Sequence, residues 1–140
     1  MKKLMLIGKT GVGKTSLTQR LNGAQYIYEK TQSLIFNGDI IDTPGEYIEN
    51  RRYYTALITT ACEADVIALV QDATEEESLF PPAFSRIFDK DVIGIITKVD
   101  LEDKNIERAE TFLRDAGVEK IFHISSETET GIAELVNYLE

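Results

Sequence analysis

The chain has 140 residues, 43% of them hydrophobic and 28% charged, so we expect one globular domain over residues 1–140. Its formal net charge of −9 argues against general binding to nucleic acid or to an anionic membrane, since both carry negative charge. A single cysteine and the lack of any apolar run near the roughly 20 residues that cross a bilayer predict a cytoplasmic protein.

A glycine-rich stretch near the start carries the clearest chemical signal. Residues 8–15 read Gly-Lys-Thr-Gly-Val-Gly-Lys-Thr, follow an apolar run and precede a stretch that suits a helix. Glycines in such a loop let the backbone aim successive N–H groups inward, and the positive end of the following helix points at the same place. The spacing G-x-x-x-x-G-K-T therefore predicts a loop that binds the phosphate chain of a nucleotide.

We assign the phosphate contacts to this loop and to the residue that follows it. Lys14 is expected to reach the β- and γ-phosphates, and the Thr15 hydroxyl is expected to bind Mg²⁺. The full set of expected contacts is Gly8, Lys9, Thr10, Gly11, Val12, Gly13, Lys14, Thr15 and Ser16.

The elements after the loop are expected as follows. A short helix over residues 16–22 ends at Gly23, and an exposed loop follows over residues 24–32. Residues 33–41 read as a strand, or as two very short strands joined at Asn37-Gly38. Residues 47–62 suit one helix. Its expected buried face consists of Ile48, Leu57, Ile58 and Ala61.

The second half alternates apolar strands with helices. Strands are expected at 65–70, 92–96 and 120–124, and helices at 81–88, 106–116 and 132–139. This alternation predicts an α/β fold with a mainly parallel sheet and helices on both faces. Ligands bind at the carboxyl ends of the strands in such folds. The phosphate loop, Asp42, Thr97 and Ser125 each follow an apolar strand, so we expect them to converge.

Two further motifs follow strands. In Asp42-Thr43-Pro44-Gly45, a D-x-x-G pattern, the Asp42 carboxylate is expected to hold Mg²⁺ through water and the Gly45 N–H to bind the γ-phosphate. In Thr97-Lys98-Val99-Asp100, an [NT]-K-x-D pattern, the Asp100 carboxylate is expected to accept two N–H bonds that guanine offers and adenine does not. The Lys98 stem would lie along the base.

These three motifs, in this order, resemble the Ras-like P-loop GTPases over nearly the whole chain. Within that group the chain resembles the bacterial PduV/EutP type, which is associated with propanediol and ethanolamine utilisation. Residues 30–32, 42–46 and 70–73 carry this closer likeness. The resemblance implies a three-layer P-loop NTPase fold, Ras-like but shortened in the first switch and its hairpin, because few residues separate Thr31 from Asp42.

The switch residues and the second base motif match the usual GTPase pattern only in part. Thr31 is the best placed candidate for the metal-binding threonine of the first switch. Glu46 stands where Ras-like proteins carry a water-orienting glutamine, and its charge beside the γ-phosphate predicts slow hydrolysis. Ser125 and Ser126 begin the second base motif, whose backbone N–H groups approach the base, but Glu127 follows them and weakens the prediction of guanine specificity.

Three functions are open from the sequence. The first is a GTP- and GDP-binding switch with slow, Mg²⁺-dependent hydrolysis by Lys14, Thr31, Gly45 and Glu46. Its loops would contact microcompartment or metabolic-pathway proteins. The second, implied by the resemblance, is an acetate kinase that uses ATP. The third is a scaffold or targeting module of a bacterial microcompartment, in which nucleotide binding is structural.

Overall fold

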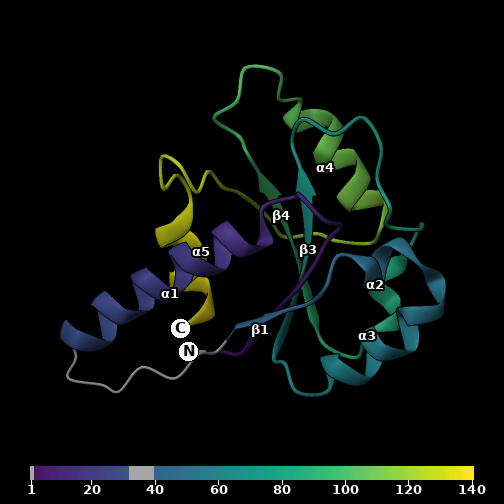
Figure 1. Ribbon diagram of the computed structural model, residues 1–140, viewed down its shortest axis with the longest axis horizontal. Coiled ribbons are helices and arrows are strands. Elements are labelled where there is room, and N and C mark those ends of the chain that lie inside the picture. Colours follow the sequence, from purple (N-terminus) through teal and green to yellow (C-terminus); the bar gives the residue numbers. More distant parts are fainter. Residues whose placement is uncertain (1, 32–39) are drawn as a thin grey trace.

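A five-stranded sheet runs through the protein (Figure 1). The computed structural model describes residues 2–31 and 40–140. Within these residues the strand order is β2-β1-β3-β4-β5, and every strand pair is parallel. The strands are β1 (Leu4–Ile7), β2 (Ile40–Asp42), β3 (Val66–Asp72), β4 (Asp91–Thr97) and β5 (Ile121–His123).

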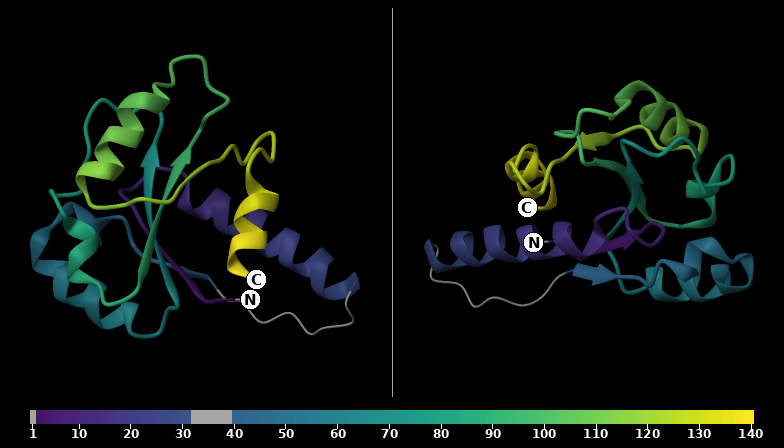
Figure 2. Two further views of the ribbon diagram at one scale, coloured as in Figure 1. Left: turned by 180° about the vertical axis from the view of Figure 1, so that it is seen from behind. Right: turned by 45° about the horizontal axis from the view of Figure 1, so that its top comes forward.

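Helices cover both faces of the sheet, as Figure 2 shows. One face packs against α1 (Lys14–Thr31) and α5 (Ile132–Leu139). The other packs against α2 (Glu46–Glu49), α3 (Tyr54–Ala61) and α4 (Ile106–Asp115). Two single 3₁₀ turns, η1 (Arg51–Tyr53) and η2 (Phe84–Ile87), complete the described elements. The predicted three-layer α/β fold is confirmed.

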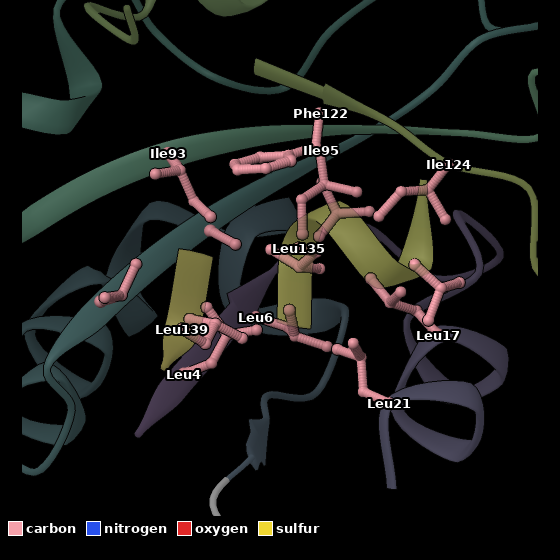
Figure 3. Packing of buried hydrophobic residues seen from close by; sticks show 14 of the residues in the cluster. Leu4, Leu6, Leu17, Leu21, Ile93, Ile95, Phe122, Ile124, Leu135 and Leu139 are labelled. Carbon is pink, nitrogen blue, oxygen red and sulfur yellow. The ribbon is translucent and has the colours of Figure 1, made fainter. Parts of the chain in front are cut away.

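The central strands are continuously apolar because both of their faces are covered. In β1, Leu4 and Leu6 belong to the core on the α1 and α5 side, while Met5 and Ile7 belong to the core on the other side. Figure 3 shows the first of these cores, in which side chains of β1 meet those of α1 and α5. Alternate side chains of β1 thus contribute to the two cores. The loop that follows β1 lies at the carboxyl end of the strand.

Helix α1 is longer than the sequence pattern predicts. It runs from Lys14 to Thr31 and passes through Gly23, where we expected it to end. Gly23 is exposed and does not adopt the left-handed conformation of a helix-ending glycine. Alanine, glutamine, glutamate and lysine, all good helix formers, occur in the residues that follow it. The expected loop over residues 24–32 is therefore wrong as far as Thr31.

The expected helix over residues 47–62 is interrupted. Asn50 has an extended backbone (φ −136°, ψ 118°), and its side chain accepts a hydrogen bond from Arg52 N, so it ends α2 and caps the next turn. Because of this break, the residues of α3 that face the sheet are only part of those expected for one continuous helix over residues 47–62. In α3, Leu57 and Ala61 face the sheet, and Ile58, which we expected to be buried, is 42% exposed.

The remaining elements lie close to their expected positions. Of the strand expected at 33–41, the structure describes β2 at Ile40–Asp42, and the Asn37-Gly38 turn lies outside the described residues. The helix expected at 81–88 is the short 3₁₀ turn η2. Over the described ranges, no helix combines the length and apolar character needed to cross a membrane.

Replacing Gly23 with alanine should stabilise the protein by about 0.5–1 kcal/mol, because alanine is the better residue inside a helix. A Cβ at this position meets no atom within 4 Å. Urea denaturation measures the change. A loss of stability would mean that Gly23 ends the helix after all. Gly94→Ala is the matched control: its Cβ would lie 2.8 Å from Leu113 Cδ1, so it should destabilise.

Candidate nucleotide-binding site

One cavity of about 620 Å³ lies at the carboxyl ends of β1, β2 and β4. Its size is in the range of small-ligand sites. The phosphate loop, Asp42 and Lys98 are far apart in sequence and meet at this cavity, as expected for strand ends of a parallel sheet, whereas Thr97 and Ser125 do not line it. The lining consists of Thr10, Gly11, Gly13, Lys14, Thr15, Ser16, Asp42, Thr43, Pro44, Gly45 and Lys98.

The loop between β1 and α1 has the backbone geometry of a phosphate cradle. Gly11 and Gly13 adopt positive φ angles of 90° and 100°, which side chains rarely permit. The first hydrogen bond of α1 follows at once, from Leu17 N to Gly13 O at 2.9 Å. The free N–H groups of the first helical turn therefore lie beside the cavity, where they favour an anion.

Lys14 lies at the wall of this cavity and is only 7% exposed. Its Nζ donates to Gly8 O at 2.6 Å and to Lys9 O at 3.0 Å. Burial lowers the pKa of this ammonium, while the negative charges of Asp42 and Glu49 act in the opposite direction. The amine thus has carbonyl partners that phosphate oxygens, as charged acceptors, can replace.

Thr15 and Asp42 form the candidate metal site. Thr15 Oγ1 donates to Asp42 Oδ2 at 3.4 Å, so two oxygen atoms lie together at the cavity. Mg²⁺ in nucleotide sites keeps several waters and takes few protein ligands, so this pair fits the ion. Clusters of three or more His, Cys, Asp or Glu side chains do not occur within residues 2–31 and 40–140. Thr31 is the last residue of α1, and its side chain lies outside the described part.

The D-x-x-G segment lies directly against the phosphate loop. A Cβ on Gly45 would lie 2.3 Å from Thr10 N, so no other residue fits there without a backbone shift. Glu46 begins α2 and its side chain is exposed. Three residues later, the Glu49 carboxylate accepts hydrogen bonds from Thr10 N and Thr10 Oγ1, each at 3.0 Å.

The base motif is joined to the phosphate loop by two side chains. Thr97 is 4% exposed, and its Oγ1 donates to Val12 O at 2.6 Å. The hydroxyl thereby fixes the position of the phosphate loop. Lys98 Nζ donates to Gly11 O at 2.8 Å. These contacts give the predicted base-binding segment a fixed position relative to the predicted phosphate-binding one.

The two base-binding segments also meet each other. Ser125 is fully buried, and its Oγ donates to Asp100 Oδ1 at 2.7 Å, which orients the carboxylate. Arg20 of α1 donates from Nε to Ser126 O at 2.7 Å and so holds the next turn of chain. A second cavity of about 240 Å³ lies beside it, lined by Ser16, Gln19, Arg20, Ser126 and Glu127.

Sequence reasoning missed a role for Asp72, the last residue of β3. Asp72 is 2% exposed, and its Oδ2 lies 2.8 Å from Lys98 Nζ. Burial alone would raise the pKa of this carboxyl, but hydrogen bonds from Lys98 and Thr74 outweigh it and lower the pKa. A carboxylate at the end of an apolar strand was the available signal. For Glu49 there was none, because its contact with Thr10 joins segments 39 residues apart.

Asp72→Asn should destabilise the protein by about 1–3 kcal/mol, since Lys98 loses its partner but is itself partly exposed. Because the folded-state pKa of Asp72 lies below its ordinary value of 3.8, this contribution is complete well above pH 3.8 and is lost as the pH falls through the folded-state pKa. Denaturation curves at neutral and acid pH measure the difference. The exposed Asp115→Asn is the control, and a difference that persists at low pH would contradict the role.

Comparison with known proteins decides the family. The family model PduV-EutP, described as "Ethanolamine utilisation - propanediol utilisation", matches residues 1–140. The chain belongs to the PduV-EutP family. A curated family member, the propanediol utilization protein PduV of Citrobacter freundii, is 46% identical over 140 residues, which cover 99% of this chain and 93% of that protein. The sequence resemblance is thereby confirmed.

Two other relatives of the PduV-EutP chain bear on its function. The probable acetate kinase EutP of Escherichia coli (strain K12) is 37% identical and matches 99% of this chain and 89% of its own length. The GTPase Der of Campylobacter jejuni (strain RM1221) is 30% identical over the whole chain, which spans 34% of Der. The names of these two relatives state different activities.

A solved structure supports the fold. The translation elongation factor SelB from Methanococcus maripaludis, in complex with the GTP analogue GppNHp, matches 99% of this chain with a TM-score of 0.69. The sequence identity is 22%, and the match covers 32% of that chain. At this identity the likeness establishes a shared P-loop NTPase fold in the PduV-EutP chain.

Proposed function

We propose that this PduV-EutP protein is a guanine-nucleotide-binding switch protein that hydrolyses GTP slowly in the presence of Mg²⁺. The observation that carries the proposal is the convergence of the phosphate loop, Asp42, Gly45 and Lys98 on one cavity. We further propose that residues 1–140 act as a single domain, because both cores lie on the two faces of one sheet.

In this proposal, each residue at the phosphate-binding end of the site has its own role. The N–H groups of the loop bind the phosphate oxygens, and Lys14 stabilises charge on the β- and γ-oxygens. Thr15 and Asp42 would hold Mg²⁺, with Thr31 as the candidate third contact, and the bound ion would neutralise charge on the phosphates. The Gly45 N–H would bind the γ-phosphate. Loss of this phosphate on hydrolysis would release the segment that carries α2.

Guanine selectivity rests on Asp100 in this proposal. Its carboxylate is oriented by Ser125 Oγ, and the neighbouring Lys98 is held between Asp72 and the phosphate loop. Guanine offers two N–H donors on one edge, which match a carboxylate, and adenine does not. The names of two matched proteins, GTPase Der and the GTP-analogue complex of SelB, agree with this choice.

Slow hydrolysis follows from the side chains near the γ-phosphate. Glu46 adds a negative charge where the γ-phosphate already repels a nucleophile. In the described part of the chain no arginine lines the cavity, and Arg52 instead donates to Tyr53 Oη and lies over its ring. Charge stabilisation in the transition state would thus depend on Lys14 and Mg²⁺ alone.

Acetate phosphorylation is the second candidate, favoured by the likeness to the probable acetate kinase EutP, which is 37% identical. In that reaction an acetate oxygen forms a bond to the γ-phosphorus of ATP, the bond to the bridging oxygen breaks, and ADP leaves. The base motif opposes it, because Asp100 accepts hydrogen bonds from guanine and adenine offers no matching donor pair.

One assay separates hydrolysis from acetate phosphorylation. The protein with Mg²⁺ is given GTP or ATP, with and without acetate, and inorganic phosphate and acetyl phosphate are measured separately. We expect slow phosphate release from GTP, independent of acetate. Acetate-dependent acetyl phosphate from ATP would establish the kinase instead, and tight nucleotide binding without either product would establish a binding module.

The family context bears on where the protein acts. The model description names ethanolamine and propanediol utilisation. We propose a cytoplasmic protein associated with a bacterial microcompartment, whose α2 segment contacts a partner in a nucleotide-dependent way. Co-sedimentation with purified microcompartments in GDP and in a GTP analogue tests this, and equal sedimentation in both would contradict a switch.

A further inference from the structure

A carboxylate is bound to the phosphate loop in this structure. Glu49, the last residue of α2, accepts hydrogen bonds from both Thr10 N and Thr10 Oγ1 at 3.0 Å. Backbone N–H groups of such a loop are donors for phosphate oxygens. The Thr10 bonds lower the pKa of Glu49, so the group on the loop is an anion at neutral pH. An internal anion therefore uses a donor that a bound nucleotide would use.

The position of Thr10 indicates which phosphate is affected. Gly45, whose N–H is the proposed sensor of the γ-phosphate, lies directly against Thr10, since a Cβ added at Gly45 would lie 2.3 Å from Thr10 N. Thr10 therefore lies on the side of the loop where the terminal phosphate would bind. With α2 docked, the Glu49 carboxylate is bound to Thr10. A terminal phosphate that binds Thr10 would have to displace this carboxylate.

The rest of the cavity is open while α2 is docked. Its 620 Å³ is lined by Thr10 and other residues of the loop, by residues 42–45 and by Lys98, and Glu49 does not contribute to the lining. A nucleoside diphosphate can therefore occupy the loop with the Glu49–Thr10 contact in place. A nucleoside triphosphate brings a second anion to Thr10, and like charges at this distance exclude each other.

We propose that Glu49 sets the phosphate-chain specificity of the site: its carboxylate takes the place of the terminal phosphate on Thr10 and biases the protein toward nucleoside diphosphate. This inference rests on the proposed function. A triphosphate must displace Glu49 and release α2 from the loop, whereas a diphosphate need not. The affinity for the two nucleotides then differs by the free energy of the Glu49–Thr10 contact, and α2 reports which nucleotide is bound.

The test is the ratio of dissociation constants for a non-hydrolysable GTP analogue and GDP, measured by calorimetry with Mg²⁺. Glu49→Gln removes the charge, and Glu49→Ala also removes the acceptor. Both should shift the ratio toward the triphosphate analogue by about fivefold or more, a typical size for coupling between ligands. The change should lie in the affinity for the analogue. Glu49 is exposed, so both variants should fold.

Glu63→Gln is the matched control, since Glu63 lies at the opposite edge of the sheet, before β3. Its ratio should equal that of the wild type. An unchanged ratio in both Glu49 variants, with both nucleotides still bound, would overturn the inference and leave the proposed function standing. An equal change in both affinities would also overturn it, since that indicates a structural role. Binding of neither nucleotide to the wild type would overturn the proposed function and the inference together.

Discussion

Lys14→Ala should weaken binding of GTP by roughly 30-fold to several thousandfold, corresponding to about 2–5 kcal/mol for removing one partner of a desolvated charge pair. Lys14 is 7% exposed and lies at the cavity wall, so water cannot replace its ammonium well. Hydrolysis should fall with it, because the residue is expected to stabilise charge on the transferring phosphate. Calorimetry with a non-hydrolysable analogue separates the loss of binding from the loss of turnover.

The matched control for this prediction is Lys90→Ala. Lys90 is exposed and lies just before β4, at the amino end of that strand and away from the cavity. Its removal changes the net charge by the same amount and should leave nucleotide affinity unchanged. If Lys14→Ala retained wild-type affinity, or if both variants lost affinity equally, the loop over residues 8–15 would not be the phosphate site.

Asp100→Asn should change the base that the protein prefers. In the proposed site the carboxylate would accept two hydrogen bonds from guanine, whereas an amide would offer one acceptor and one donor, which match xanthine. We expect GTP affinity to fall and XTP affinity to rise, with a change in their ratio on the order of 100-fold. Competition titrations against a fluorescent nucleotide measure both affinities in the same protein.

The exposed Asp103→Asn, three residues further along the chain, is the control for this substitution. It should bind GTP as the wild type does. The Asp100 variant should also retain its phosphate contacts, so its affinity for XTP is the sign that the site is intact. A loss of both nucleotides would indicate that the Ser125–Asp100 hydrogen bond is needed for folding of this segment. An unchanged preference would mean that Asp100 does not read the base.

The layers of the fold could be predicted because local sequence and tertiary structure agree there. The continuous apolar runs of β3 and β4 have no period, and this pattern occurs when helices cover both faces of a sheet. Both ends of helix α5 were predicted correctly because its buried side chains repeat at helical spacing. The convergence of the strand ends then followed from the parallel topology.

The segments around α1 and α2 could not be predicted in the same way. Gly23 is a frequent helix end, but nothing in the pattern of neighbouring residues revealed whether it adopts a left-handed conformation. Asn50 ends α2 through its own backbone and the cap to Arg52, an interaction that a periodic pattern does not reveal. The contact of Glu49 with Thr10 joins segments 39 residues apart, and no local pattern in the sequence reveals it.

Some expectations stay predictions. The side chain of Thr31, the candidate switch threonine, lies outside the described part of the structure. Glu46 is exposed at the start of α2, and its expected effect on hydrolysis depends on a nucleotide being bound. Ser126 lies beside a second cavity, where Arg20 holds its carbonyl.

Binding of guanine nucleotide by this family member is tested directly by titration of the wild type with GDP, GTP and ATP in Mg²⁺. We expect both guanine nucleotides to bind on the order of 100-fold tighter than ATP, because a site built around an oriented acceptor rejects a base that lacks the donors. ATP binding as tight as GTP binding, or tighter, would show that the protein does not select guanine.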